Sequence, residues 1–271
     1  MTSSNPIGVF DSGVGGLSVL REIRRELPNE DLLYVADSAH APYGNKLDYQ
    51  IEVRAIAIVE FLVSQQAKAI VVACNTASGA AIETLRARFS IPIVAMEPAV
   101  KPAATHTKSG VVGVLATSRT LSSGNFTRLS ARFGANVNLL MQACPGLVEQ
   151  VEAGDLSGSN TRALVERYVV PLLEQNADTL VLGCTHYPFL STLIQEIAGP
   201  AVTIINPAPA VARELRRRLA SITMLSHGMR DGTEHFWTSN CPEMSRPVLS
   251  KLWGASVDVS SLPDSSAVQI D

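Results

Sequence analysis

The chain has 271 residues, of which 46% are hydrophobic and 17% charged, and its formal net charge is −3. This composition is typical of a folded protein with an aliphatic core, and it excludes a disordered or strongly basic chain. Because the charge is slightly negative and no apolar run reaches the roughly 20 residues that span a bilayer, we expect neither nucleic acid nor membrane as a partner. The first residues lack the pattern of a secretion signal, so we expect a cytoplasmic location.

Short apolar runs rich in β-branched residues alternate with longer amphipathic segments along the first part of the chain. The apolar runs predict strands at residues 7–10, 32–36, 69–73 and 91–95. The amphipathic segments predict helices at residues 17–27, 49–65 and 77–89. Strands that alternate with helices in this way predict a mostly parallel sheet.

The second part of the chain repeats this alternation. It predicts strands at residues 111–115, 137–140, 179–182 and 202–205. It predicts helices at residues 121–133, 147–153, 160–175 and 189–198. The sequence AIVVACNTAS around Cys74 parallels TLVLGCTHYP around Cys184, and IGVFDSGVGGLSVL parallels VGVLATSRTLSSGN. The chain is therefore predicted to contain two related halves.

These patterns predict an α/β fold of two pseudo-symmetric domains, each a mostly parallel sheet flanked by helices, with the active site in the cleft between them. The chain would cross between domains near Pro98 and again near Pro207. The expected domains are residues 1–97 plus 207–271 and residues 98–206. A helix at residues 209–219 and the tail after it would return to the first domain, and the polar tail from Asp264 onward should be frayed.

Cys74 and Cys184 stand at equivalent places, each at the end of a predicted strand. Cys74 is followed by Asn75 and Thr76, residue types that suit the start of a helix. Ligands of parallel sheets bind outside the carboxyl ends of the strands, and a helix N-terminus lowers a thiol pKa from its free value of about 8.5. Two such thiols facing each other suit a racemase, which removes a proton from one face of an α-carbon and returns one to the other.

Asp11 ends the first predicted strand, in the sequence DSGVGG. One interpretation is a dinucleotide-binding loop, with Asp37 as the ribose-binding acid. Against it, Gly13 and Gly15 are followed by Ser18 at the third glycine position of the G-x-G-x-x-G pattern. The favoured interpretation is that Asp11 helps the first cysteine to manage its proton, while the N–H groups of the loop are available to an anion.

His186 follows Cys184 by two residues and is placed to assist proton transfer at that thiol. The alternative is a zinc site made of Cys74, Cys184 and His186, although these residues lack a local chelating spacing. The five lysines of the chain show no setting for a pyridoxal Schiff base. We therefore expect neither a metal nor a cofactor.

Several other residues have a structural interpretation on pattern alone. The sequence APYG at residues 41–44 predicts a turn, which would lie at the same strand ends as the two cysteines. Glu152 is predicted to be a solvated carboxylate at a helix end. The arginine-rich stretch at residues 213–218 predicts a solvated helix face. Cys144 and Cys241 have no polar strand-end setting, so we expect them to be structural.

The motifs FDSGVGGLSV, APYG, ACNTAS and GCTHYP, in this order, closely resemble those of the bacterial glutamate racemase family of the aspartate/glutamate racemase superfamily. The resemblance covers roughly residues 7–219. It implies interconversion of L-glutamate and D-glutamate without metal or pyridoxal phosphate, supply of D-glutamate for peptidoglycan and cell shape, and a homodimer. It also implies that Cys74 deprotonates the D enantiomer and Cys184 the L enantiomer. Asp11 would support the first thiol and His186 the second.

The same resemblance implies a set of residues that contact the substrate. They are Asp11, Ser12, Tyr43, Gly44, Asn75, Thr76, Thr117, Thr185 and His186. The family's additional catalytic carboxylate aligns with Glu152. One alternative is an aspartate or hydantoin racemase of the same superfamily, which would share the cysteines but not the full DSGVGG segment. Another is a non-catalytic ligand-binding relative, which the retention of both cysteines disfavours.

Overall fold

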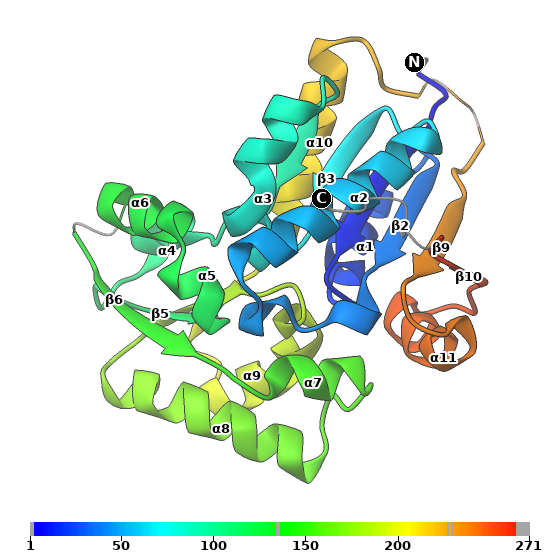
Figure 1. Cartoon of the computed structure of the whole chain (residues 1–271). Helices are drawn as coiled ribbons and strands as arrows, with labels where there is room; N and C mark the ends of the chain where they lie inside the picture. The colour runs from blue at the N-terminus through cyan, green and yellow to red at the C-terminus, as the bar shows by residue number, and fades with distance from the viewer. Residues whose placement is uncertain (1–2, 134–135, 227, 229, 264–271) are drawn as a thin grey trace.

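Two parallel β-sheets organise the chain, which a computed structural model describes at residues 3–133, 136–226, 228 and 230–263. The larger sheet has the strand order β10-β9-β2-β1-β3-β4, and the smaller sheet has the order β6-β5-β7-β8. Every strand pairing within the described residues is parallel. Figure 1 shows the larger sheet at upper right and the smaller sheet at lower left. The predicted α/β fold with two mostly parallel sheets is confirmed.

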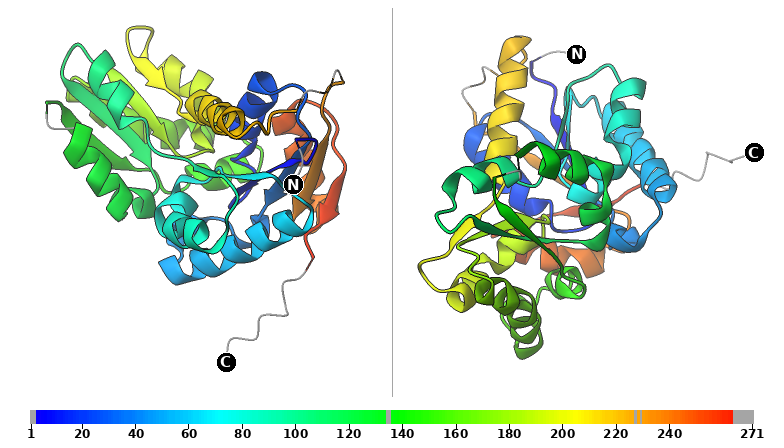
Figure 2. Two further views of the ribbon diagram at one scale, coloured as in Figure 1. Left: turned by 90° about the horizontal axis from the view of Figure 1, so that it is seen from above. Right: turned by 90° about the vertical axis from the view of Figure 1, so that its left-hand side faces the viewer.

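The larger sheet separates two layers of helices. Its strands are β1 (Ile7–Asp11), β2 (Leu32–Ala36), β3 (Ala69–Val72), β4 (Ile93–Ala95), β9 (Glu234–Thr238) and β10 (Val259–Ser261). Its helices are α1 (Leu17–Glu26), α2 (Asp48–Ser64), α3 (Asn75–Arg88), α10 (Ala208–Ser221) and α11 (Pro242–Trp253). Val9 packs with α1 and α10, whereas its neighbour Phe10 packs with α2 and α3, because successive strand residues point to opposite faces. Figure 2 shows α10 (gold) and α2 (blue) on opposite sides of this sheet.

The smaller sheet repeats part of the larger one. Its strands are β5 (Val111–Ala116), β6 (Asn138–Ala143), β7 (Thr179–Gly183) and β8 (Thr203–Ile205). Its helices are α4 (Val100–His106), α5 (Ser118–Ser122), α6 (Gly124–Phe133), α7 (Leu147–Glu152), α8 (Ser159–Glu174) and α9 (Ser191–Ala198). The order β6-β5-β7-β8 matches β2-β1-β3-β4, so β5 corresponds to β1 and β7 to β3. The predicted repeat is therefore present in the strand order. We call the larger sheet with its helices the first half, and the smaller sheet with its helices the second half.

The chain returns to the first half after β8. Helix α10 packs on α1, strand β9 pairs with β2, and β10 pairs with β9. Figure 1 shows these last strands and α11, in orange and red, beyond β2. The sequence predicts the return and the helix α10, but it predicts neither β9 and β10 nor α11. The reason lies in residues such as Glu234, which is partly exposed, and His235, which is exposed: both are polar and break the apolar run expected of a buried parallel strand.

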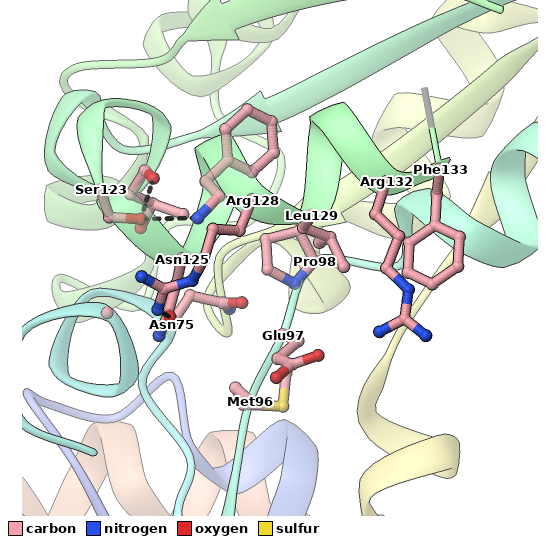
Figure 3. A pocket seen from close by; sticks show the side chains of 13 residues that line it. Asn75, Met96, Glu97, Pro98, Ser123, Asn125, Arg128, Leu129, Arg132 and Phe133 are labelled. Carbon is pink, nitrogen blue, oxygen red and sulfur yellow. Dashed lines mark hydrogen bonds between the residues drawn. The ribbon is translucent and has the colours of Figure 1, made fainter. Parts of the chain in front are cut away.

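Two helical segments differ from the prediction. The pattern predicts one helix at residues 121–133, but the chain has α5 and α6, separated at Ser123, whose backbone is extended. The Oγ of Ser123 accepts the N–H of Phe126 at 3.2 Å and so caps α6 (Figure 3). Helix α4 is absent from the prediction because it is short and contains Pro102, which leaves no periodic apolar pattern.

The chain passes between the two sheets twice. Strand β4 ends at Ala95 and β5 begins at Val111, while β8 ends at Ile205 and α10 begins at Ala208. The domain bounds stay a prediction. The tail expected to be frayed from residue 264 lies outside the described residues. Within the described part of the chain, no helix is long and apolar enough to cross a membrane.

Candidate active site

The carboxyl ends of the two sheets meet at one closed cavity. Cys74 lies two residues after β3 and Cys184 directly after β7, and they are only 5% and 6% exposed. The cavity is lined by Ser12, Pro42, Tyr43, Gly44, Cys74, Asn75, Thr76, Thr117, Val148, Cys184, Thr185 and His186. The fold thus brings most of the predicted site residues together, with Asp11 and Glu152 behind the lining. The cavity volume of about 10 Å³ leaves room for about one water molecule.

Cys74 caps helix α3. Its Sγ accepts the N–H of Ala77 at 3.4 Å, and its thiol donates to Oγ of Ser12 at 3.6 Å. The helix N-terminus predicts a lowered thiol pKa, and this prediction is wrong. Burial and the negative charge of Asp11 raise the pKa of Cys74 from 9.0 to about 12. The desolvation of a thiolate outweighs the partial charge of the helix end, so Cys74 is a neutral thiol at neutral pH.

Cys184, His186 and Glu152 form a chain of contacts. The Sγ of Cys184 lies 3.7 Å from Nδ1 of His186, whose Nε2 lies 2.7 Å from Oε1 of Glu152. Burial alone would lower the pKa of His186, but its contacts with Cys184 and Glu152 raise that pKa well above its usual value. A histidine held in this way can accept and release protons for the thiol. On pattern alone Glu152 is a solvated helix end, whereas the fold places it against the imidazole.

Asp11 lies beneath the cavity and connects the two halves. Its carboxylate accepts the N–H of Gly13 at 2.9 Å and the hydroxyl of Thr185 at 3.0 Å. Ser18 strengthens this connection by donating to the carbonyl of Thr185 at 2.8 Å. The side chain is fully buried, and burial raises the pKa of Asp11 although the charge of His186 opposes the shift. The negative charge of this carboxylate therefore acts on Cys74 and raises the pKa of its thiol.

The DSGVGG loop is shaped around two side chains of the second half. A Cβ atom at Gly13 would overlap the carboxylate of Glu152, and one at Gly15 would overlap the ring of His186. The N–H of Val14 donates to Oε1 of Glu152 at 2.8 Å. The anion that this loop binds is thus a carboxylate of the protein itself. Because the glycines admit side chains from the other half, the dinucleotide interpretation is wrong for this loop.

The APYG sequence forms part of the cavity wall and is more than a turn. Tyr43 is buried, and its hydroxyl donates to Oδ2 of Asp37 at 2.6 Å. Arg54 donates to both carboxylate oxygens of Asp37, at 2.7 and 3.0 Å. Burial alone would raise the pKa of Asp37, but Arg54 and Tyr43 lower it. This buried network anchors the segment that carries Pro42 and Gly44. Pro42 lines the cavity, although the sequence does not predict it as a site residue.

Three threonine hydroxyls join the halves beside the cavity. The Oγ1 atoms of Thr76, Thr117 and Thr120 lie 3.0 to 3.1 Å from one another. The sequence does not predict a role for Thr120, because a threonine within a polar helix gives no distinguishing pattern. The sequence also gives no sign that Val148 lines the cavity, since an apolar helix residue normally indicates only core packing.

Asn75 has two buried side-chain polar atoms, a nitrogen and an oxygen, without a hydrogen-bond partner among the described residues. Asn75 lines the closed cavity and also a larger pocket of about 340 Å³ between α3 and α6. Figure 3 shows this pocket, with the side chain of Arg128 on the side of Asn75 and that of Arg132 on the other side of Glu97 in this view. A buried amide without a partner is costly, so Asn75 is a strong candidate to bind a ligand.

Arg119 makes a polar contact between the halves near the cavity wall. Its Nη2 and Nε donate to the carbonyl of Lys46 at 2.6 and 3.0 Å, and its Nε lies 3.5 Å from the carboxylate of Asp48. Arg119 belongs to α5 of the second half, whereas Lys46 and Asp48 follow the APYG segment of the first half. The contact therefore fastens that segment to the opposite half.

The remaining cysteines lie outside the cavity lining. Cys144 is buried and its thiol donates to the carbonyl of Gln142, whereas Cys241 is exposed and contacts Glu243. Across the described residues, no group of three histidine, cysteine, aspartate or glutamate side chains is arranged to hold a metal ion. The described residues therefore offer no set of ligands for the zinc site considered above.

The class of protein follows from this fold and site, and comparison with known proteins agrees. The family model described as Asp/Glu/Hydantoin racemase matches residues 7–215, and the chain belongs to this family. Within it, the chain is 57% identical to the glutamate racemase of Methylococcus capsulatus over 96% of both chains. The crystal structure of a glutamate racemase from Bacillus anthracis superimposes with a TM-score of 0.87 at 33% identity, covering 96% of this chain and 98% of that one.

A second structural relative is the glutamate racemase of Francisella tularensis in complex with D-glutamate. It has a TM-score of 0.84 at 29% identity, and the match covers 97% of this chain and 99% of that one. These relatives confirm the resemblance to glutamate racemases that the four sequence motifs indicate.

Proposed function

We propose that this protein interconverts L-glutamate and D-glutamate by proton transfer between Cys74 and Cys184, without a cofactor. The observation that carries the proposal is that both thiols line one small buried cavity from equivalent strands of the two halves. The relative from Francisella tularensis is described with D-glutamate bound, which supports glutamate as the substrate over aspartate or a hydantoin. The D-glutamate formed would supply peptidoglycan synthesis.

In the direction from L to D, the thiolate of Cys184 takes the α-proton and the thiol of Cys74 delivers a proton to the opposite face. The reverse reaction exchanges the two roles. His186 accepts or returns a proton at Cys184 over the 3.7 Å contact. Cys74 must ionise to react with the D enantiomer despite its raised pKa, and the ammonium group of the substrate supplies a positive charge that favours its thiolate.

The α-proton of an amino acid is weakly acidic, so the site must stabilise the developing negative charge. The free amide of Asn75 and the hydroxyls of Thr76, Thr117 and Thr185 surround the cavity and supply hydrogen-bond donors. Such preorganised donors in a dry site are worth several kcal/mol. The closed cavity is too small for glutamate, so the domains proposed at residues 1–97 plus 207–271 and 98–206 would separate to admit it.

Single replacements Cys74→Ser and Cys184→Ser test the proposal, with the exposed Cys241→Ser as the matched control. We expect both site variants to lose inversion of either enantiomer, because a hydroxyl is too weak an acid to replace the thiol, while the control keeps full activity. Full activity in either site variant would remove that cysteine from the mechanism. Inversion of aspartate in preference to glutamate would favour the rival racemase, and a wild-type protein that inverts neither would favour a non-catalytic relative.

A cytoplasmic location and a homodimer complete the proposal, and the resemblance to the glutamate racemase family implies the dimer. Light scattering behind a size-exclusion column tests this assembly by giving the mass in solution. A mass of one chain at micromolar concentration would contradict it.

A further inference from the structure

Glu152 lies between the closed catalytic cavity and an open groove. The groove has a volume of about 280 Å³ and lies between α7 and α11. It is lined by Ser38, Ala41, Pro42, Val148, Glu149, Glu152, Asn240, Met244, Ser245 and Val248. Pro42 and Val148 line both spaces and therefore form the wall between them. The side chain of Glu152 lines the groove and remains 20% exposed, so part of it is open to water.

A continuous set of contacts leads through this wall. His186 lines the cavity, Glu152 lines the groove, and Nε2 and Oε1 of the two residues are 2.7 Å apart. On its other side, the imidazole meets the Sγ of Cys184 at 3.7 Å. An imidazole can accept a proton at one nitrogen and release one from the other, so these three side chains connect the thiol to the groove.

Cys74 has no equivalent connection among the described residues. Its thiol contacts Ser12 Oγ and the N–H of Ala77, and both groups are buried. The nearby carboxylate of Asp11 is fully buried, and within the described residues it accepts hydrogen bonds from Gly13 and Thr185. The two cysteines are therefore equivalent in the fold but differ in their access to solvent protons.

We propose that Glu152 and His186 exchange the proton of Cys184 with water in the groove while the catalytic cavity stays closed. This proposal rests on the two-cysteine function. Each L-to-D turnover leaves the α-proton on Cys184 and Cys74 as a thiolate, so the enzyme must reset before the next turnover. In the reset, His186 starts as a neutral imidazole with its hydrogen on Nε2, because a protonated Cys184 no longer offers the negative charge that favours a second proton on the ring. The S–H bond of Cys184 breaks as Nδ1–H forms, Nε2–H breaks as the acid O–H of Glu152 forms, and water takes that proton. Turnover from D to L runs the same relay in the opposite sense and returns the hydrogen to Nε2. Cys74 regains its proton from water once the product has left the opened cavity.

The replacement Glu152→Gln tests the route, with Glu149→Gln as the matched control. Glutamine keeps an oxygen that can accept the N–H of Val14, but it cannot carry a proton between His186 and water. Glu149 lines the same groove on the same helix, and it lies outside the contacts of His186. Wild-type protein in the same assay must invert glutamate, and a wild-type protein that fails to do so would overturn the proposed function itself.

Initial rates are measured with ordinary and α-deuterated L-glutamate over a range of concentrations. We expect the Glu152→Gln variant to lose about tenfold or more in kcat, because resetting becomes the slow step, while kcat/KM changes much less. The isotope effect of the α-deuterium should persist on kcat/KM and approach 1 on kcat. Added formate, a small carboxylate that can enter the groove, should restore kcat. Glu149→Gln should match the wild type.

The variant could instead lose kcat and kcat/KM equally, with the isotope effect unchanged on both and no rescue by formate. That result would overturn the proposal, because it would show that Glu152 only positions His186 for the chemical step. Unchanged kinetics in the variant would also overturn the proposal. Thermal unfolding of each variant shows whether a loss of activity reflects a loss of fold.

Discussion

The imidazole ring of His186 occupies the space in which a side chain at Gly15 would lie. These residues belong to different halves, so a glycine near the end of β1 determines how closely the histidine after β7 approaches. The same loop admits the carboxylate of Glu152 beside Gly13 and binds it through the N–H of Val14. The DSGVGG segment therefore provides the space in which His186 and Glu152 of the other half pack.

The replacement Gly15→Ala should displace His186, because the ring is rigid and has no free space on that side. We expect kcat/KM to fall about 100-fold or more, as for the loss of a general acid–base group. The matched control is Gly124→Ala, where the nearest side-chain atom to the added methyl would be 3.8 Å away. Circular dichroism follows the racemisation of L-glutamate. Wild-type activity in Gly15→Ala would contradict the proposed role of His186.

The raised pKa of Cys74 makes stability depend on pH. Between the unfolded pKa of 9.0 and the folded pKa of about 12, the unfolded chain releases this proton while the folded protein keeps it. Stability is therefore fully present below pH 9 and falls by about 1.4 kcal/mol for each pH unit above it. The Cys74→Ser variant lacks this contribution. Urea unfolding at about pH 8 and about pH 10 should show a correspondingly larger loss in the wild type, and equal losses would contradict the buried, neutral thiol.

The hydrogen bond from Tyr43 to Asp37 should stabilise the cavity wall. Tyr43→Phe removes only the hydroxyl, and we expect a loss of about 1.5–3 kcal/mol in the free energy of unfolding, since the acceptor is a buried charge. Tyr49→Phe is the control, because Tyr49 is 62% exposed. Urea denaturation measures both variants. Equal stability of the two variants would show that the Tyr43 hydroxyl adds nothing to the anchor.

Arg119 should favour closure of the cavity over bound substrate. Arg119→Ala removes both hydrogen bonds to the carbonyl of Lys46, so the closed state becomes less populated and the apparent affinity falls. We expect KM to rise about tenfold, equivalent to about 1.4 kcal/mol, with little change in kcat. Arg217→Ala is the control, since Arg217 pairs with Glu214 on its own helix. A fall in kcat at constant KM would place Arg119 in the chemical step instead.

Much of this organisation is visible in the sequence because the signals are local. A buried parallel strand such as β3 is a continuous apolar run, and Cys74 follows it at a place where the chain must enter a helix. The two halves share this arrangement, so the pairing of Cys74 with Cys184 follows from repetition alone. The family resemblance then adds to the predicted site those residues, such as Glu152, whose neighbouring sequence contains no distinguishing motif.

The features that escape the sequence depend on contacts between distant segments. Strand β9 joins β2 across about 200 residues, and its partly exposed side chains resemble a loop. The pKa of Cys74 depends on Asp11 and on burial, which spacing does not reveal. Similarly, Pro42 and Val148 line the cavity only because two halves close over it.

The most direct test of the central claim is to incubate the wild-type protein with L-glutamate in heavy water, following optical rotation and deuterium at the α-carbon together. A two-cysteine racemase predicts that the optical rotation decays to zero and that the D-glutamate formed carries deuterium at the α-carbon, because the thiol that delivers the proton has exchanged with solvent. Unchanged rotation with no deuterium at the α-carbon would contradict the account.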